Sequence, residues 1–130
     1  MWRWGIEGKM KSRESMVRLK RFQVEEKRRQ VAQIDGMIAE FDRMSDELDA
    51  QIKAEQDRTG ISDASHFAYS TFARAAMQRR DNLKASASEL RSQRDTAAVE
   101  LDLVEEELEK MELLAERDGR GPGERNERVA

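Results

Sequence analysis

Apolar side chains recur along the first part of the chain with the spacing of a coiled coil. From about Met10 to Asp57, residues seven apart form one column, and the residues three further on form a second. The first column holds Val17, Val24, Val31, Ile38, Ser45 and Ile52, and the second holds Lys20, Lys27, Ile34, Phe41, Leu48 and Glu55. Such columns occupy the a and d positions of a coiled coil, so this segment is predicted to be one long helix.

The second part of the chain, from about Ser70 to Asp118, repeats the pattern. One column holds Tyr69, Ala76, Leu83, Leu90, Ala97, Val104 and Met111, and the other holds Ala73, Arg80, Ala87, Arg94, Leu101, Leu108 and Ala115. Between the two parts lie Gly60, a residue typical of helix ends, and four candidate helix caps, Ser62, Asp63, Ser65 and Ser70. The fold prediction is therefore an all-α protein of two long helices in an antiparallel coiled-coil hairpin, with a helix over 10–57, a bend over 58–69 and a helix over 70–118.

The two arms also predict a register. If facing residue numbers add to 128, each a position meets a d position, so that Val24 faces Val104 and Ile38 faces Leu90. Every charged residue of the columns except Glu55 then faces a large aliphatic side chain. Long basic side chains can lay their stems on a partner helix while the charge reaches water. A slip of one heptad is the alternative register.

Charge is arranged in blocks that favour the same orientation. Residues 9–30 hold nine basic and three acidic side chains, whereas residues 99–118 hold two basic and nine acidic ones. Nearer the bend the signs reverse, with a net −4 over residues 40–58 and +4 over residues 74–94. An antiparallel hairpin places each block beside its opposite. Exposed ion pairs contribute only about 0.2–1 kcal/mol each, but blocks of this size select an orientation.

Composition limits the classes of protein that fit. The chain has 130 residues, 39% of them charged and 5% aromatic, which suits one domain of long helices. It has no cysteine, so it has no disulfides and no thiolate metal site. No run of 18 apolar residues is present, so we expect no membrane insertion and a cytoplasmic protein.

Both ends of the chain depart from the heptad pattern. Residues 1–9 carry Trp2 and Trp4, and we expect a disordered extension or a start site upstream of the true one at Met10. The alternative is an anchor at a membrane interface. Residues 119–130 contain three glycines and the only proline, which predicts a disordered tail.

The residues offer little for catalysis. The only histidine, His66, lies near serines and Asp63 in the bend. A nucleophile and its base need a pocket and a fixed geometry, which a two-helix hairpin does not offer. One histidine without cysteines also gives no recognisable metal-ligand spacing. We therefore expect no enzyme activity, no metal and no cofactor.

Two groups of side chains exceed what a hairpin needs. Met16, Leu19 and Phe22 lie off the columns among Arg18 and Arg21, at the open end of the hairpin. Exposed apolar patches usually mark partner sites. The alternative for this patch is packing against the C-terminal segment or against another copy of the chain.

The second group gathers aromatic side chains at the bend. It consists of His66, Phe67, Tyr69 and Phe72. Aromatic residues dominate binding hot spots, so a docking tip is one interpretation. The other is a small cluster that caps the tip and contacts no partner.

The basic run of the first arm, from Arg18 to Arg29, could grip a phosphate backbone. The acidic arm folded beside it would neutralise it and repel nucleic acid. We therefore do not expect nucleic-acid binding.

Two stretches resemble a known family. Residues 10–30, MKSRESMVRLKRFQVEEKRRQ, resemble the start of the short form of the FliJ family of flagellar export proteins. Residues 66–83, which include HFAY, TFARAA and QRRDNL, are similar to the tip and early second helix of that family. The resemblance covers about residues 10–118, and the first nine residues depart from the family pattern.

The resemblance implies a coiled coil similar to the central stalk of rotary ATPases. Such a stalk inserts its open end into the hexameric ring of the flagellar export ATPase and promotes its assembly and activity. The family is also associated with the cytoplasmic domain of the export gate, a membrane protein at the flagellar basal body in the inner membrane, and with export chaperones. By this resemblance, the ATPase ring would contact Met16, Arg18, Leu19, Arg21 and Phe22, and the gate would contact the mid-to-tip surface that includes Phe67, Tyr69 and Phe72. A scaffolding coiled coil unrelated to export is the alternative, followed by a nucleic-acid-associated hairpin.

Overall fold

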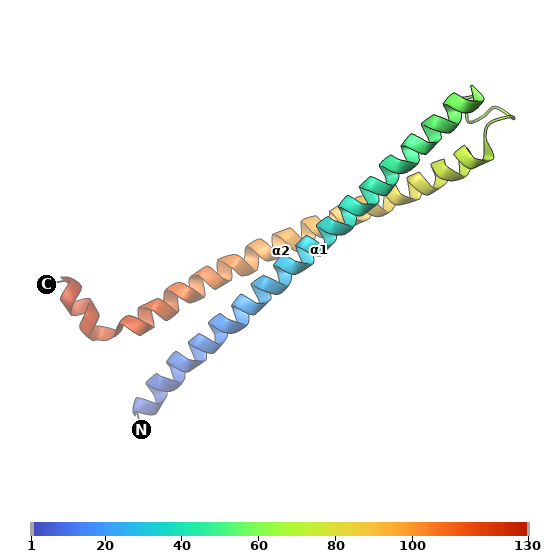
Figure 1. The fold of residues 1–130 in the computed structure, drawn as a ribbon. Helices are drawn as coiled ribbons and strands as arrows, with labels where there is room; N and C mark the ends of the chain where they lie inside the picture. Colours follow the sequence, from blue (N-terminus) through green and yellow to red (C-terminus); the bar gives the residue numbers. More distant parts are fainter. Residues whose placement is uncertain (1, 130) are drawn as a thin grey trace. The chain divides into compact units, whose positions relative to one another are not determined.

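The computed structural model consists of two long helices packed against each other in antiparallel directions (Figure 1). It describes the backbone of residues 2–129 and the side chains of residues 12–119. Helix α1 spans Trp2–Thr59 and helix α2 spans Thr71–Val129, and no strand occurs among these residues. The predicted all-α hairpin is confirmed. At the bend the predicted helix ends differ from the observed ones by one or two residues.

At the other ends, α1 begins and α2 ends beyond the predicted bounds of 10 and 118. The predictions of a disordered extension over residues 1–9 and a disordered tail over residues 119–130 fall almost entirely outside the part of the chain whose side chains are described. They stay predictions.

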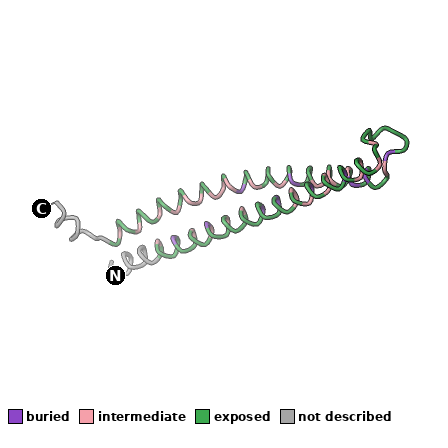
Figure 2. Tube along the Cα trace, turned by 45° about the horizontal axis from the view of Figure 1, so that its top comes forward, coloured by how far each residue is buried: buried purple, intermediate pink, exposed green. Residues whose placement is uncertain are grey.

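Buried residues follow the two predicted columns. From Val17 to Ala115, every column residue is buried or half-buried, and Figure 2 shows these positions recurring along one side of each helix. The least exposed of the apolar ones are small or β-branched, namely Val24, Ala73, Ala87 and Ala97. A narrow seam buries few large side chains and so contributes little to stability. The charged residues on the outside therefore add to the stability of the hairpin through their helix propensity and their ion pairs.

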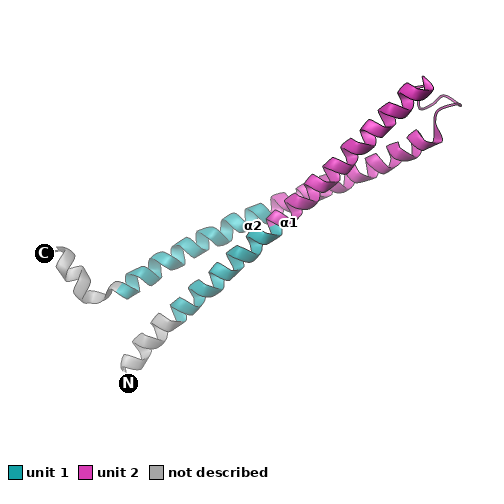
Figure 3. Ribbon diagram, viewed as in Figure 1, with its two compact units in different colours: residues 1–30, 97–130 teal, residues 31–96 magenta. Residues whose placement is uncertain are grey.

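The chain divides into two units, coloured in Figure 3. Unit 1 contains α1 as far as Gln30 and α2 from Ala97 onward, and unit 2 contains Val31–Thr96 with the loop. In each unit the two helix segments run antiparallel and are joined by ion pairs of the predicted signs. In unit 1, basic residues of α1 meet acidic residues of α2, and in unit 2 the signs are reversed.

The ion pairs also fix the register inside each unit. When the numbers of two facing column residues add to 128, the e positions of the two helices also face each other. The residue numbers of such an e–e pair add to 133. A slip of one heptad would change this value to 126 or 140. The structure contains four such pairs: Arg21–Glu112 and Arg28–Glu105 in unit 1, and Asp42–Arg91 and Asp49–Lys84 in unit 2. The predicted register is therefore confirmed in each unit.

The basic residues within the columns behave as predicted, and each gains a carboxylate partner. The Nζ atom of Lys20 lies 2.6 Å from Oε2 of Glu107. Arg80 donates to Oδ1 of Asp49 at 3.0 Å. The hydrogen bonds that Arg80 donates to Asp49 and Asp81 raise the pKa of its guanidinium, so it stays charged at the seam.

Charge exchange across unit 1 tests this register. Arg21→Glu with Arg28→Glu replaces the attractions to Glu112 and Glu105 across the seam, and that of Arg28 to Glu25 on its own helix, by three repulsions. At about 0.2–1 kcal/mol per exposed pair, we expect the free energy of unfolding to fall by about 1–2 kcal/mol. Adding Glu105→Arg and Glu112→Arg should recover most of the loss. Urea unfolding followed by circular dichroism measures both steps, and a quadruple variant as unstable as the double would contradict the pairing.

Ser45 is a buried polar residue in the α1 column. It is 3% exposed, and its hydroxyl has no hydrogen-bond partner. A buried hydroxyl without a partner costs about 1–3 kcal/mol, and alanine also has the higher helix propensity. We expect Ser45→Ala to raise the free energy of unfolding by about 1 kcal/mol, measured by urea unfolding. Ser86→Ala is the exposed control, and an equal gain there would assign the effect to helix propensity alone.

Backbone chemistry explains both ends of the loop. Gly60 has a φ of 73°, a left-handed conformation that favours glycine, and its N–H donates to the carbonyl of Gln56 at 2.8 Å. Ser70 is the N-cap of α2, because its hydroxyl accepts the Ala73 N–H at 3.2 Å. Among the other candidate caps, Asp63 instead accepts the backbone N–H of Ser65 and stabilises a turn inside the loop.

Candidate protein-binding surfaces

The predicted apolar patch of the first arm is exposed in unit 1. Leu19 and Phe22 are 58% and 60% exposed, and Met16 is about half exposed. All three side chains lie off the buried columns, so the hairpin does not use them for its own seam. Their exposure is the main feature of unit 1 that packing within the hairpin leaves unexplained.

Two hollows lie beside this patch. The smaller one has a volume of about 190 Å³ and is lined by Arg13, Met16, Met111 and Leu114. The larger one has a volume of about 520 Å³ and is lined by Phe22, Gln23, Glu26, Lys27, Gln30 and Val104. Both hollows draw residues from α1 and α2, so the patch is a shallow groove between the helices and not a bulge on one of them.

The structure separates the predicted arginines from the apolar residues. Arg21 occupies an e position and donates to Oε1 of Glu112 at 3.1 Å. Arg18 is exposed and occupies a b position, next to the e positions on the helix surface. Met16 occupies a g position, on the other side of the seam. Met16 at g and Leu19 at c therefore lie on the side of the seam opposite Arg21, whereas Phe22, at f, lies on the outer face of the helix between Arg18 and Leu19.

Helix α2 adds exposed apolar residues that the sequence-based prediction does not name. Val99, Leu103, Leu113 and Leu114 all lie outside its buried columns. The signal is present in the sequence, because each is a large apolar residue at an outer heptad position. Leu103 at c and Leu114 at g lie on the same side of the seam as Met16, so they extend the patch onto the second helix.

At the tip, Tyr69 is part of the hairpin itself. It is 5% exposed, its hydroxyl accepts a hydrogen bond from Nε2 of Gln56 at 2.9 Å, and it donates to the sulfur of Met77 at 3.2 Å. The guanidinium of Arg74 lies 5.8 Å from the centre of its ring, a cation–π contact. Tyr69 thus joins the end of α1 to the start of α2.

The other aromatic residues of the tip face outward. Phe67 is 95% exposed and stacks on His66 with ring centres 4.8 Å apart, and Phe72 is also exposed. Nδ1 of His66 accepts the N–H of Ala68 at 3.0 Å, which holds the imidazole beside Phe67. Phe67 and Phe72 are therefore available to a partner, whereas Tyr69 is not.

The carboxylate of Glu55 links the end of α1 to the residue that precedes α2. Glu55 accepts hydrogen bonds from Arg58 on its own helix and from the hydroxyl of Ser70, at 2.5 Å and 2.9 Å. The Arg58 and Ser70 hydrogen bonds lower the pKa of the Glu55 carboxyl. Ser70 therefore both caps α2 and donates to α1, which fixes the start of the second helix.

Matched alanine substitutions separate the two roles of the tip aromatics. Tyr69→Ala removes a buried ring and its hydrogen bonds, so we expect the free energy of unfolding to fall by about 3 kcal/mol. Phe67→Ala removes an exposed ring and should change it by less than about 0.5 kcal/mol. Thermal unfolding of both variants checks this, and equal losses would contradict the assignment of Tyr69 as the internal anchor.

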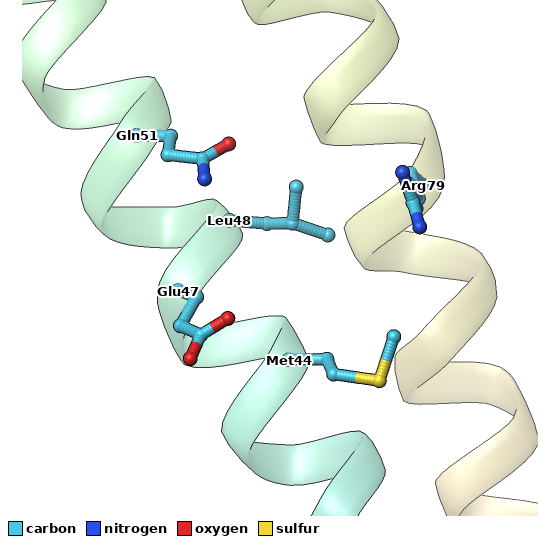
Figure 4. Close-up of a pocket in the computed structure, with 5 residues that line it drawn as sticks. All are labelled: Met44, Glu47, Leu48, Gln51 and Arg79. Carbon is cyan, nitrogen blue, oxygen red and sulfur yellow. The ribbon is translucent and has the colours of Figure 1, made fainter.

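Unit 2 has a smaller hollow on the same side of its own seam. It has a volume of about 150 Å³ and is lined by Met44, Glu47, Leu48, Gln51 and Arg79. In Figure 4, Met44 and Leu48 extend from α1 toward α2, where Arg79 lies. The hollow is polar at its rim and shows no arrangement of catalytic groups.

Two further properties bear on the site. Among the residues that the structure describes, no three histidine, cysteine, aspartate or glutamate side chains gather in a way that would bind a metal ion. Within the same residues, neither helix has a stretch that is long and apolar enough to cross a membrane.

Comparisons with known proteins gave no match. No protein-family model matches the chain, and no curated protein or solved structure is significantly similar to it. The resemblance to flagellar export proteins thus rests on the residues quoted for it and stays a prediction.

Proposed function

We propose that this chain is an accessory factor of flagellar protein export, a stalk-like adaptor that acts by binding and not by catalysis. Its open end would bind the hexameric export ATPase, and its tip would bind the export gate. The observation that carries the proposal is the exposed trio Met16, Leu19 and Phe22 in unit 1. The resemblance of residues 10–30 to the FliJ family supports the choice of partner.

The surface of unit 1 suits contact with a protein ring. Leu19 and Phe22 supply large apolar side chains, and hollows beside them can accept side chains of the ATPase. Arg18 is exposed nearby, so it can contact acidic residues around the pore. Rim charges of this kind contribute mainly to the rate and specificity of association.

The tip would bind the cytoplasmic domain of the export gate. Phe67 and Phe72 are exposed there, and His66 lies beside Phe67. Such a protein would act in the cytoplasm at the flagellar basal body, and export chaperones are further candidate partners by the same resemblance.

The structure gives less support to nucleic-acid binding. Lys20, Lys27 and Arg28 of the basic run each pair with a glutamate of α2. Binding a phosphate backbone would require these pairs to break or would bring the acidic helix close to the phosphates.

Co-purification tests the two contacts separately. The tagged chain should retain the export ATPase and the cytoplasmic domain of the gate from the same organism, each purified alone. Phe67→Ala with Phe72→Ala should release the gate domain and keep the ATPase. A strain that lacks the chain should lose swimming motility. Failure to retain either protein, together with unchanged motility, would refute the proposal.

A further inference from the structure

The two edges of unit 1 differ in chemistry. One edge contains the e positions, where Arg21 and Arg28 pair with Glu112 and Glu105. We call it the charged edge. The other contains the g positions and the neighbouring outer residues, and we call it the apolar edge. It is made of Met16, Leu19, Phe22, Leu103, Met111 and Leu114.

The two column lysines beside the apolar edge are paired within the chain. Lys20 and Lys27 reach across the seam to Glu107 and Glu100, which occupy g positions of α2. A surface that covers this edge therefore need not neutralise these two lysines, and apolar side chains suit the exposed leucines and methionine there.

The apolar edge has the shape of a site for helices. Its two hollows, beside Met16 and beside Phe22, each lie between α1 and α2 and have volumes of about 190 and 520 Å³. Side chains from another helix pack into such spaces between neighbouring helices.

We propose that a second copy of this chain covers the apolar edge, so that two unit 1 segments form a four-helix bundle. The second copy supplies the same apolar side chains and the same hollows, so the surface is self-complementary. From Arg13 to Gln30 the edge is about 27 Å long at ~1.5 Å per residue and about 20 Å wide. Two copies would bury about 1,100 Å², which is enough for a specific but weak dimer.

Charge selects between two arrangements of such a dimer. If the two-fold axis runs along the helices, α1 of one copy faces α2 of the other. If the axis crosses the helices, α1 faces α1 and α2 faces α2. Residues 12–30 hold seven basic and three acidic side chains, whereas residues 97–119 hold two basic and nine acidic ones. The first arrangement joins opposite charges, so the open ends of the two copies lie together.

This dimer goes beyond the proposed function and does not depend on it, but it covers Met16, Leu19 and Phe22, so binding to the ATPase ring would displace the second copy. The test uses the purified chain alone, so its failure leaves the export proposal standing. Conversely, failure to bind the ATPase leaves the dimer standing.

The chain contains no cysteine, so an introduced cysteine is the only thiol that can form a disulfide. With the axis along the helices, Met16 of one copy faces Leu114 of the other, so a mixture of Met16→Cys and Leu114→Cys chains should form mixed disulfide-linked dimers under mild oxidation. A mixture of Arg18→Cys and Leu114→Cys is the control and should stay monomeric, because Arg18 is exposed toward the charged edge. A mixture of Met16→Cys and Gln30→Cys should give few mixed dimers, whereas mixed dimers there in place of Met16–Leu114 pairs would overturn the proposed axis.

Sedimentation equilibrium gives the second readout. The unmodified chain should associate reversibly at micromolar concentrations, and Leu114→Asp should weaken association by at least about tenfold, a loss of about 1.4 kcal/mol. Arg18→Gln should leave it unchanged. A monomer at about 200 µM, with the Met16→Cys and Leu114→Cys mixture cross-linking no faster than the Arg18→Cys and Leu114→Cys mixture, would overturn the proposal and leave the apolar edge to a different partner.

Discussion

Ile38→Asp is expected to unfold the hairpin at 25 °C. Ile38 is buried in the α1 column of unit 2, and its layer neighbour in the confirmed register is Leu90. An aspartate there would have to bury a carboxylate without a partner, at a cost of several kcal/mol. A single domain of this kind has about 5–15 kcal/mol of stability in total, and the seam is narrow. Most of the helical circular dichroism signal should be lost.

The adjacent residue provides the control for this substitution. Met37 occupies an exposed g position, so Met37→Asp introduces the same charge one residue away without burying it. Its helical signal and unfolding midpoint should stay close to those of the unmodified chain. If both variants keep their helices, or both lose them, the assignment of the seam is wrong.

Leu19→Ala with Phe22→Ala is expected to abolish activation of the export ATPase. Both side chains are exposed, so their loss should leave the helical signal unchanged, and any effect must come from a partner contact. Truncating an interface anchor costs about 2 kcal/mol or more, so two anchors together should weaken binding by at least about 100-fold. The measurement is ATP turnover of the hexamer at a fixed concentration of the variant.

A matched double variant at the tip controls for loss of exposed apolar area. Phe67→Ala with Phe72→Ala removes two exposed aromatic rings far along the sequence from Leu19 and should activate the ATPase as well as the unmodified chain does. Full activation by the Leu19 and Phe22 variant would show that the ATPase contact lies elsewhere on the chain.

Much of the fold could be predicted because a single seven-residue repeat of apolar positions determines the buried side of both helices. The columns through Val24 and Ala97 are buried as their spacing requires, and the blocks of charge alone indicate the antiparallel orientation. The pairs Arg21–Glu112 and Asp42–Arg91 then excluded a slipped register. At the bend, the residue types at Gly60 and Ser70 were sufficient because their backbone roles are chemically specific.

The candidate sites were less predictable, because exposure depends on neighbours that a single heptad column does not describe. Tyr69 belongs both to the buried column of α2 and to the aromatic group of the tip, so the sequence allows it to be a core residue or a partner contact. Its hydrogen bonds with Gln56 and Met77 show that it is a core residue. The difference between the two edges of unit 1 is likewise a property of both helices together. It becomes visible once Leu103 and Leu114 are placed beside Met16 by the register.

The most direct test of the proposed function is ATP turnover of the purified export ATPase, measured while the purified chain is added in increasing amounts. The account predicts that turnover rises and saturates as the ring assembles around the open end of the hairpin. Turnover that stays flat at every concentration, with no complex formed, would contradict it.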